Sequence, residues 1–543
     1  MVFARRSTTL LAAIIASCAM VLSLTACTSD NKTVVDGQTT VTSNSAGGVA
    51  VFTPSDGITL NQQMPLNKWA KLVPDLTKAL VDAGFKKGDI DHTTSDSLAK
   101  QSRAIQDFVV DHLSNNTTDD SGIAIAPDNM TLLVAPVVEA DASTRQYGDY
   151  VSQNLSTNDA TDGEATSDGE SSEDDSSKDD SSNTESDSTA SDEQAQAVDR
   201  LVSSLKLAKE SGMHVVLLGN SIEGYKPDAF VKFSDAQTIG KLQAEKMVSK
   251  LKLDKASKDN PKYIEVLLPY TAVDEKGNAN DSTFAQEAFR GIWQVLGSYY
   301  QKGVVESPSG TLDGKSTEND WQAVAYDAAK EGSTAKVLDK RLAKTDGQST
   351  LTRIDGIITM NDYIASEVVK ELDDLGYTGS AADINPQITI SGIVGNITGK
   401  KDLSRDAVPD PIKSPENDNA NDSSSSDDDA DEDTSASDKD RDSQWPLVTG
   451  YGAYVSNIPS IVNGKQWMTG MEDRQTIATD IAQACAKLNK DEALNSMPSI
   501  RNSEVGGVKK IPTISEPLLA VSASNLKSAL IDPGYISLAD AGL

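Results

Sequence analysis

The sequence predicts an α/β protein with two lobes, each built on a parallel sheet. Short apolar segments alternate with amphipathic helical segments along most of the chain, a pattern typical of parallel strands that helices cover on both faces. Two strongly acidic tracts interrupt the pattern and contain almost no apolar residues. They leave roughly 430 residues for the folded part, too many for one doubly wound sheet.

The N-terminus predicts export and lipid attachment. Arg5 and Arg6 precede an apolar run from Leu10 to Leu24, which is too short to span a bilayer comfortably and is typical of a signal peptide over residues 1–26. The following Leu-Thr-Ala-Cys resembles the bacterial lipoprotein cleavage box, which implies that Cys27 becomes the lipidated first residue. We therefore expect a flexible tether over residues 27–47 and a membrane-anchored protein on the extracytoplasmic face.

In the first lobe, a strand is expected at residues 48–53 (GVAVFT), followed by a helix whose apolar positions include Leu66, Trp69 and Leu76. Pro74 lies inside that helix and predicts a kink or break. A helix around residues 105–109, a strand at 132–138, a helix at 198–208 and a strand at 214–219 complete the pattern. Strands and helices thus alternate throughout the first lobe.

The second lobe repeats the alternation. Strands are expected at residues 263–270, 354–360 and 446–452, and helices at 285–299, 362–375 and around 458–461. Residues 388–395 (ITISGIVG) also have the character of a strand, and they compete with 446–452 for one place in the sheet. The sequence leaves open which of the two occupies it.

The net charge of -33 is concentrated in two insertions. Residues 159–193 carry -13 and residues 416–442 carry -10, mostly on Ser- and Asp-rich segments that cannot bury enough surface to fold. We expect both insertions, 154–196 and 402–443, to be disordered. So acidic a chain is a poor partner for nucleic acid, because phosphates bind to clusters of Lys and Arg.

Cysteine and histidine usage predicts no metal site, no cofactor and no internal disulfide. Cys18 leaves with the signal peptide, Cys27 is acylated and Cys485 remains alone, while the three histidines are far apart in sequence. No nucleophile elbow, zinc helix or Cys-His pair is present. We therefore expect the protein not to be an enzyme.

Ligands of open α/β sheets bind outside the carboxyl ends of the strands. The residues that follow the expected strands are therefore the candidates for a binding site. They are Asp56, Asn220, Tyr270, Asp274, Asn361 and Tyr451, to which Trp69 is added as a flat ring able to stack on a sugar. The alternatives are core packing for Trp69 and solvated loop positions for Asp56 and Asp274, and Asp362 is expected to cap the following helix.

The order of motifs resembles the type I periplasmic substrate-binding proteins, in the branch that includes xylose- and ribose-binding proteins. The motifs are VAVFTPSD, LLVAPV, AKESGMHVVLLGNS, FSDAQTIGKLQAE, FAQEAFRGIWQVL, DWQAVAYDAA, IDGIITMNDYIASEVVKELDDLGYTG and VTGYGAYVSNIPSIVNGKQWMT. This resemblance implies a clamshell of two Rossmann-like lobes joined by three crossovers. It places the N-terminal lobe at 48–219, the C-terminal lobe at 220–469, a return to the first at 470–511 and the end of the second at 512–543.

The family's polar clamp is altered in this chain. Gly219-Asn220 stands where sugar binders usually carry Asp-Arg, Phe284 stands where they carry Asn, and Gly450-Tyr451-Gly452 replaces Gly-x-Asp. Either the pocket is less polar and more aromatic, or the register slips locally. Asn361 matches the family's ligand-contacting Asn.

The resemblance implies the binding protein of an ABC importer, which binds a mono- or short oligosaccharide as a monomer and delivers it to a membrane permease. The alternative, motivated by the altered clamp and the acidic insertions, is a sensory or adhesive surface module that keeps the clamshell without transport.

Overall fold

The computed structural model describes residues 32–35, 38–41, 46–55, 65–115, 125–138, 145–150, 153–156, 185–273, 280–343, 351–381 and 445–542. The chain divides into two units, residues 1–46 and 47–543. In the first unit, β1 (Lys32–Val35) pairs antiparallel with β2 (Gln38–Val41). The expected tether at 27–47 therefore includes a hairpin, which its polar composition does not predict.

The first sheet of the second unit has the strand order β17-β18-β9-β7-β5-β3-β4 among the described residues. Its strands pair in parallel except for β17 with β18. The strands are β3 (Gly48–Pro54), β4 (Ile90–Ser95), β5 (Met130–Val134), β7 (His214–Leu218), β9 (Ala229–Lys232), β17 (Ile500–Val505) and β18 (Val508–Ser515). All five residues of β5 are buried, as expected for a central strand.

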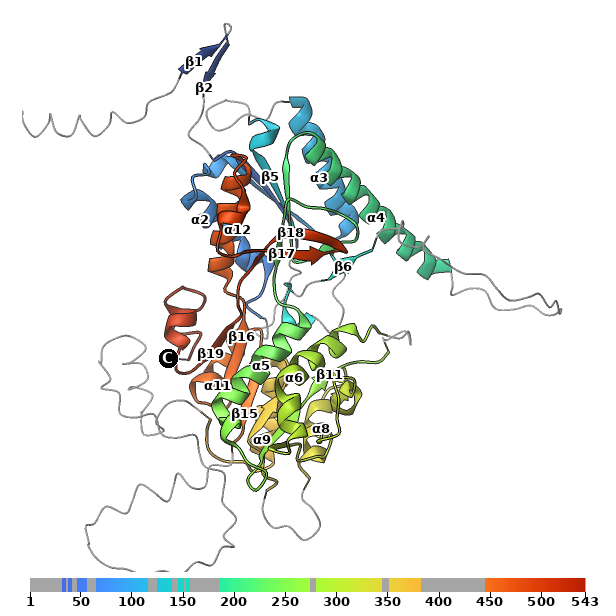
Figure 1. The fold of residues 1–543 in the computed structure, drawn as a ribbon, viewed down its shortest axis with the longest axis vertical. Coiled ribbons are helices and arrows are strands. Elements are labelled where there is room, and N and C mark those ends of the chain that lie inside the picture. The colour runs from blue at the N-terminus through green and yellow to red at the C-terminus, as the bar shows by residue number, and fades with distance from the viewer. Residues whose placement is uncertain are drawn as a thin grey trace, which may run out of the picture. The chain divides into compact units, whose positions relative to one another are not determined.

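Two pairs of helices cover this sheet, as Figure 1 shows: α2 (Trp69–Asp82) lies beside α12 (Arg474–Leu488), and α3 (Leu98–Asn115) beside α4 (Glu185–Glu210). Helix α2 is continuous through Pro74, so the expected break is wrong. Leu72, Leu76 and Leu80 are buried on one face of α2, and this apolar stripe anchors the helix to the lobe.

The second sheet has the order β12-β10-β14-β15-β16-β19 within the described part of the chain, parallel except for β16 with β19. Its strands are β12 (Val305–Glu306), β10 (Lys262–Val266), β14 (Gly356–Ile358), β15 (Leu447–Tyr451), β16 (Met468–Met471) and β19 (Leu519–Ser522). The segment 446–452 thus forms a central strand. The competing segment 388–395 lies outside the described residues.

Helices pack on this second sheet as well. α5 (Ala236–Leu251) packs closely on α6 (Thr283–Gln301), and α8 (Ser333–Arg341) packs on α9 (Asp362–Asp374). Glycine permits the α5–α6 contact, because a Cβ on Gly240 would lie 2.2 Å from the Ala288 carbonyl oxygen and one on Gly291 would lie 2.0 Å from that of Gln237. Shorter helical elements are α7 (Trp321–Val324) and α11 (Ile458–Val462).

Short strands complete the described structure. The expected strand 263–270 is divided into β10 and β11 (Leu268–Pro269), and β11 pairs with β13 (Ala325–Tyr326) outside the main sheet. Near the first sheet, β6 (Asn154–Leu155) pairs with β8 (Ser221–Ile222). Residues 154–155 and the start of α4 at Glu185 belong to the insertion expected to be disordered, so that expectation is wrong at both ends of 154–196.

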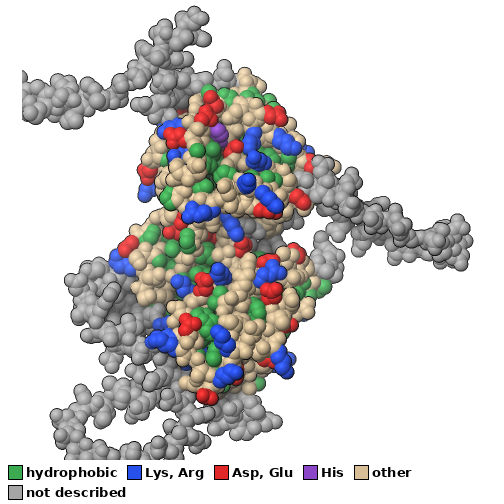
Figure 2. Space-filling model, in the orientation of Figure 1, with side chains coloured by type: hydrophobic (Ala, Val, Ile, Leu, Met, Phe, Trp, Pro, Cys, Tyr) green, Lys and Arg blue, Asp and Glu red, His purple; other side chains and the backbone are tan. Residues whose placement is uncertain are grey.

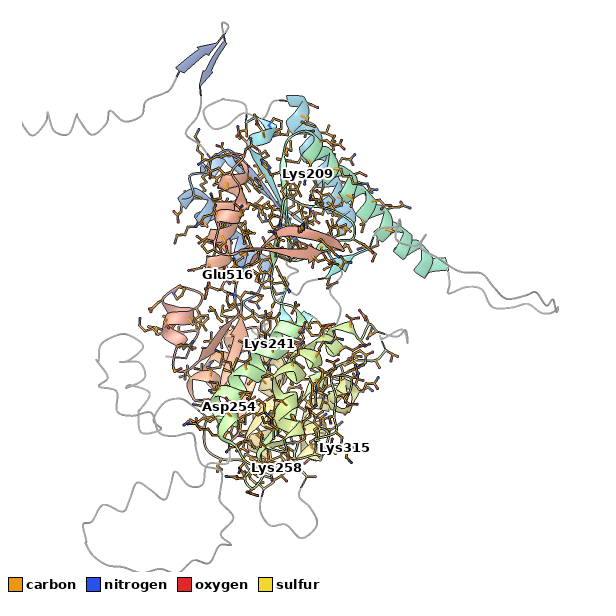
Figure 3. The ribbon with its side chains drawn as sticks, viewed as in Figure 1. Lys209, Lys241, Asp254, Lys258, Lys315 and Glu516 are labelled. Carbon is orange, nitrogen blue, oxygen red and sulfur yellow. The ribbon has the colours of Figure 1, made fainter. Side chains whose placement is uncertain are left out.

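The chain passes between the two sheets three times in the described structure, which confirms the expected number of crossovers. The first connection follows β9, the second follows β16, and the third joins β18 to β19. Glu516, labelled in Figure 3, lies on the third connection. The three lobe boundaries predicted at residues 219, 469 and 511 therefore move toward the C-terminus. Strand β9 lies after residue 219 but belongs to the first lobe, β16 continues the second lobe past residue 469, and β18 continues the first lobe past residue 511.

The surface of the described part carries mixed charge. In Figure 2, blue and red side chains are interspersed on the visible face of both lobes, without a large area of one sign. This agrees with the concentration of the net charge in the two insertions. Among the described helices, none combines the length and apolar character that a membrane crossing requires.

Candidate functional site

Segments that follow the strands of both sheets meet at one place, which we call the interlobe junction. It comprises residues 65–69, 146–150, 219–220, 233–235, 284, 360–362, 451–454 and 472. The backbone amide of Leu66, from the first lobe, donates to the Gly452 carbonyl oxygen of the second at 2.8 Å. Because open α/β sheets bind ligands at the carboxyl ends of their strands, the junction is the candidate site.

Trp69, the first residue of α2, is only 2% exposed. Its ring packs edge-on against Tyr150, at 5.0 Å between centroids, and against Phe233 at 5.7 Å. Tyr150 and Phe233 stack on each other at 4.7 Å. Of the two roles that the sequence leaves open for Trp69, the structure shows core packing within this ring cluster.

Asn220 follows β7 and is 2% exposed. Its side-chain nitrogen donates to the Pro136 carbonyl oxygen at 2.9 Å, and its side-chain oxygen accepts from the Gln153 backbone amide at 2.9 Å. Both ends of the amide are therefore bonded within the first lobe. Asn220 joins the segments after β5 and β7.

Asn361 begins α9. Its side-chain oxygen accepts from the Ile364 backbone amide at 2.9 Å, and its backbone is extended, so Asn361 is the N-cap. The expectation that Asp362 caps the helix is wrong, because Asp362 is already the first helical residue. The side-chain nitrogen of Asn361 donates to Oε1 of Gln146 at 3.1 Å and thereby reaches the first lobe.

Asp362 is completely buried and its carboxylate is fully bonded. It accepts from Nε2 of Gln466 at 2.7 Å, from the Thr469 hydroxyl at 2.9 Å and from the Tyr454 backbone amide at 2.9 Å. Burial raises the pKa of Asp362 to about 6, although these hydrogen bonds act in the opposite direction. The carboxylate therefore holds the segment after β15 against α9.

Tyr451, at the end of β15, is also completely buried. Its hydroxyl accepts from Nδ2 of Asn67 at 3.0 Å and shares a 2.5 Å hydrogen bond with the Ser234 hydroxyl. It also donates to Oε1 of Glu472 at 3.5 Å. The Tyr451 hydroxyl is thus bonded to the first lobe through Asn67 and to the first and second connections through Ser234 and Glu472.

Glu472 joins two of the three connections. It lies on the second connection, and its Oε1 accepts from the backbone amide of Ser234, on the first connection, at 2.5 Å. Glu472 is 1% exposed, and burial raises its pKa to about 7 against the opposing effect of its hydrogen bonds. The carboxyl group of Glu472 therefore lies between the first and second connections, whether it is protonated or ionised.

Sequence reasoning missed the segment Gln146–Tyr150, which fills part of the junction. The backbone carbonyl of Gln146 accepts from the Tyr454 hydroxyl at 2.7 Å, and the Tyr147 ring packs 4.6 Å from that of Phe284. The only signal in the sequence was a pair of tyrosines in RQYGDY, within a polar stretch after a strand. Phe284 gives the junction an aromatic wall.

Tyr270, the other predicted site residue in the described part of the chain, does not join this group. Tyr270, after β11, is half-buried, donates to the Asn280 carbonyl oxygen at 3.1 Å and packs edge-on against Trp321 at 5.2 Å. Its described contacts lie within the second lobe. Asp56, Asp274 and Cys27 lie outside the described residues.

The junction combines neutral hydrogen-bonding groups with aromatic rings. Asn361 and Tyr454 supply donors, while Tyr147 and Phe284 supply ring surfaces. Its carboxyl groups are all engaged by protein donors: Asp149, Asp235, Asp362 and Glu472. Nowhere in the described ranges do three or more His, Cys, Asp or Glu side chains gather closely enough to hold a metal ion.

Comparison with known proteins yields structural resemblances only. No family model matches the chain, and no curated protein matches it. A solute-binding protein of an ABC transporter from Clostridium phytofermentans, with bound β-D-glucose, has 17% identity and a TM-score of 0.44 over 91% of this chain and 99% of its own. A carbohydrate transporter solute-binding protein from Chloroflexus aurantiacus, in complex with D-glucose, has 18% identity and a TM-score of 0.41. The match covers 92% of this chain and 98% of that protein. A periplasmic ribose ABC transporter protein from Conexibacter woesei has 13% identity and a TM-score of 0.42. The match covers 90% of this chain and 96% of that protein.

Proposed function

We propose that this protein is the lipid-anchored, extracytoplasmic solute-binding protein of an ABC importer and binds a mono- or short oligosaccharide at the interlobe junction. The order of the sequence motifs supports this, as do the two parallel sheets with three connections between them. Connections of this kind can act as a hinge, so that ligand contacts to both lobes favour a closed arrangement.

The observation that carries the proposal is the set of donors at the junction. Asn361 and the Tyr454 hydroxyl each donate a hydrogen bond to an uncharged oxygen of Gln146. The ring of Phe284 lies close by, packed against Tyr147. Donors for neutral oxygens beside an aromatic face suit a polyol, whose hydroxyl groups need bonding and whose ring face is apolar.

The charge of the junction favours a neutral ligand over an anionic one. Burial already raises the pKa values of Asp362 and Glu472 to about 6 and about 7. An added anion would make these two buried carboxyl groups still harder to ionise. Sugars therefore fit better than sugar phosphates or carboxylic acids.

Titration calorimetry tests the ligand class. The mature protein, residues 27–543, is titrated with D-glucose, D-xylose, D-ribose and maltose, and with D-glucose 6-phosphate as the matched anionic control. We expect at least one neutral sugar to bind and the phosphate to bind more weakly or not at all. Binding of a different solute, with no response to any sugar, would contradict the sugar assignment.

The anchor and the importer need separate tests. Cys27→Ser is expected to abolish incorporation of radiolabelled palmitate and to release the protein from the membrane fraction. Deletion of the gene is expected to abolish uptake of the bound sugar. If the wild-type protein incorporates no palmitate, the anchor proposal fails while the binding proposal stands.

A sensory or adhesive surface module is the second candidate. The filled junction favours it, because Trp69, Asn361 and Tyr451 are all buried against the protein's own groups. Uptake of the bound sugar decides between the two candidates. If the protein binds a sugar and its deletion leaves uptake unchanged, the module is the better description.

A further inference from the structure

The segment Gln146–Tyr150 uses the donors that a ligand at the junction would need. Asn361 donates to the side-chain oxygen of Gln146 at 3.1 Å, and the Tyr454 hydroxyl donates to its backbone carbonyl at 2.7 Å. These contacts join residues 215 and 308 positions apart in the sequence. While they persist, neither donor hydrogen can bond a ligand oxygen.

Tyr147 fills the space between these donors and the ring of Phe284. It is 1% exposed, and its ring lies 4.6 Å from that of Phe284 and 6.3 Å from that of Tyr451. Its hydroxyl is buried, which raises the pKa of Tyr147, and the interaction of this hydroxyl with the Asn361 side chain has a smaller, lowering effect. Tyr147 thus contacts both Asn361 and Phe284.

The other end of the segment is fixed to the first lobe. Asp149 forms an ion pair with Lys68 at 2.6 Å and accepts from the Trp69 backbone amide at 3.0 Å. The Tyr150 hydroxyl donates to the Lys68 carbonyl oxygen at 2.6 Å. Gly148 permits the close approach, because its φ is +97° and a Cβ there would lie 2.5 Å from the Asn67 carbonyl oxygen.

We propose that Gln146 and Tyr147 are a built-in occupant of the ligand site, which a sugar must displace in order to bind. This rests on the proposed function, namely that the junction is the ligand site. Gln146 mimics the ligand with two neutral oxygens, and Tyr147 mimics its flat face. Asp149 and Tyr150 hold the segment on the first lobe, so that after displacement it stays beside the site and competes with the ligand.

An internal occupant lowers the apparent affinity by the fraction of molecules in which the site is free. Removing one of its hydrogen bonds raises that fraction. Gln146→Ala is therefore expected to tighten binding of the sugar that the wild-type protein binds by about three- to tenfold. If Gln146 were instead a wall residue that contacts the ligand, the same substitution would weaken binding.

The test combines calorimetry with hydrogen–deuterium exchange of the peptide that contains residues 146–150. D-glucose, D-xylose and D-ribose serve as probes. In the ligand-free protein, Gln146→Ala is expected to accelerate exchange of this peptide, and a saturating probe is expected to accelerate it in the wild type. Gln153→Ala is the matched control: Gln153 is half-buried on the same stretch of chain, and its bond to Asn220 runs through the backbone amide, which the substitution keeps.

The outcomes separate this proposal from the proposed function. Weaker binding by Gln146→Ala, or slower exchange of the segment on saturation, would overturn the competing role. If neither the wild type nor Gln146→Ala binds a probe, the sugar function fails, and hydrogen–deuterium exchange alone tests whether residues 146–150 are docked at the junction. Faster exchange of their peptide in Gln146→Ala would support the docking. Unchanged exchange would refute it. A second variant, Gln146→Ala with Tyr147→Ser, is expected to increase both effects, provided that its melting temperature shows a folded protein.

Discussion

The two lobes contribute to the junction in different ways. In the first lobe, both ends of the Asn220 side-chain amide form hydrogen bonds with neighbouring segments of that lobe. In the second lobe, Asn361 uses one end to cap its own helix and the other to reach the first lobe. Two asparagines that each follow a central strand therefore differ in role: one fixes its own lobe, and the other joins the lobes.

This difference extends to the surrounding side chains. On the first-lobe side, Trp69 and Tyr150 form a ring cluster with Phe233. On the second-lobe side, Tyr451 and Tyr454 direct their hydroxyl groups at partners from the first lobe. The first lobe thus contributes mainly packed aromatic rings, and the second contributes the hydroxyl groups that form hydrogen bonds across the junction. Specificity for a ligand should therefore depend more on second-lobe residues.

The largest expected effect concerns Asp362. Asp362→Ala leaves the side chains of Gln466 and Thr469 and one backbone amide without their acceptor, and is expected to lower the free energy of unfolding by about 3–5 kcal/mol. Urea denaturation measures this. Asp373→Ala is the control on the same helix, because its ion pair with Lys465 is half-exposed and should cost less than about 1 kcal/mol. Equal losses would break the claim that the second lobe depends on its buried polar groups.

Glu472 predicts a pH dependence. Burial raises its pKa from 4.5 to about 7, so the folded chain holds this proton more tightly than the unfolded chain does. The stabilisation from that proton is complete below pH 4.5 and is lost as the pH rises to 7, by about 3 kcal/mol in total.

The glutamine in Glu472→Gln cannot ionise, so this variant is expected to show a flatter dependence of the unfolding free energy on pH between 4.5 and about 7. Above about pH 7 it is expected to be more stable than the wild type. Urea denaturation at several pH values measures the difference. Glu492→Gln serves as the surface control, because Glu492 is exposed and paired with Lys487. A wild-type profile parallel to that of the Glu472→Gln variant would show that folding leaves the pKa of Glu472 unchanged and would contradict the prediction.

Asn220→Ala tests the structural role assigned to the first lobe. It removes two buried hydrogen bonds and is expected to lower the free energy of unfolding by about 2 kcal/mol while leaving sugar affinity within about twofold. Asn319→Ala, at an exposed position, should change stability by less than about 0.5 kcal/mol. A tenfold loss of affinity in Asn220→Ala without a loss of stability would make Asn220 a ligand contact.

Tyr270→Phe should have the smallest effect. It removes one half-buried hydrogen bond to Asn280 and keeps the ring contact with Trp321, so we expect a loss of at most about 1 kcal/mol. Calorimetry should find sugar affinity unchanged. A clear loss of affinity would place the ligand at the end of β11 and away from the junction.

The apolar strands could be predicted closely from the sequence, because full burial leaves a continuous apolar run. The expected strands 48–53 and 214–219 correspond to β3 and β7 within a residue. Strand β4 was missed because it lies at the sheet edge, where four of its six side chains, from Asp91 to Thr94, are exposed and polar. An edge strand carries too little apolar pattern to be distinguished from a loop.

The candidate site was harder to predict, because its contacts are not local. Asn361 and Tyr451 were named from their positions after strands, and both lie at the junction. Their partners, Gln146 and Asn67, could not be inferred, because no periodicity relates residues hundreds of positions apart. The cap was assigned one residue too late, since Asn and Asp are both good caps and only the backbone geometry decides between them.

The order of the strands has a consequence for how the protein is made. Strand β9 pairs with β7 on one side and with β18 on the other, and β18 is separated from β9 by the whole of the second lobe's main sheet except β19. Until residues 508–515 have been synthesised, β9 presents an open edge to which other chains can pair. Helix α12, which packs on α2, arrives almost as late. The first lobe to be translated is therefore completed only near the end of synthesis, and chains that end early carry an unprotected strand rather than a finished domain.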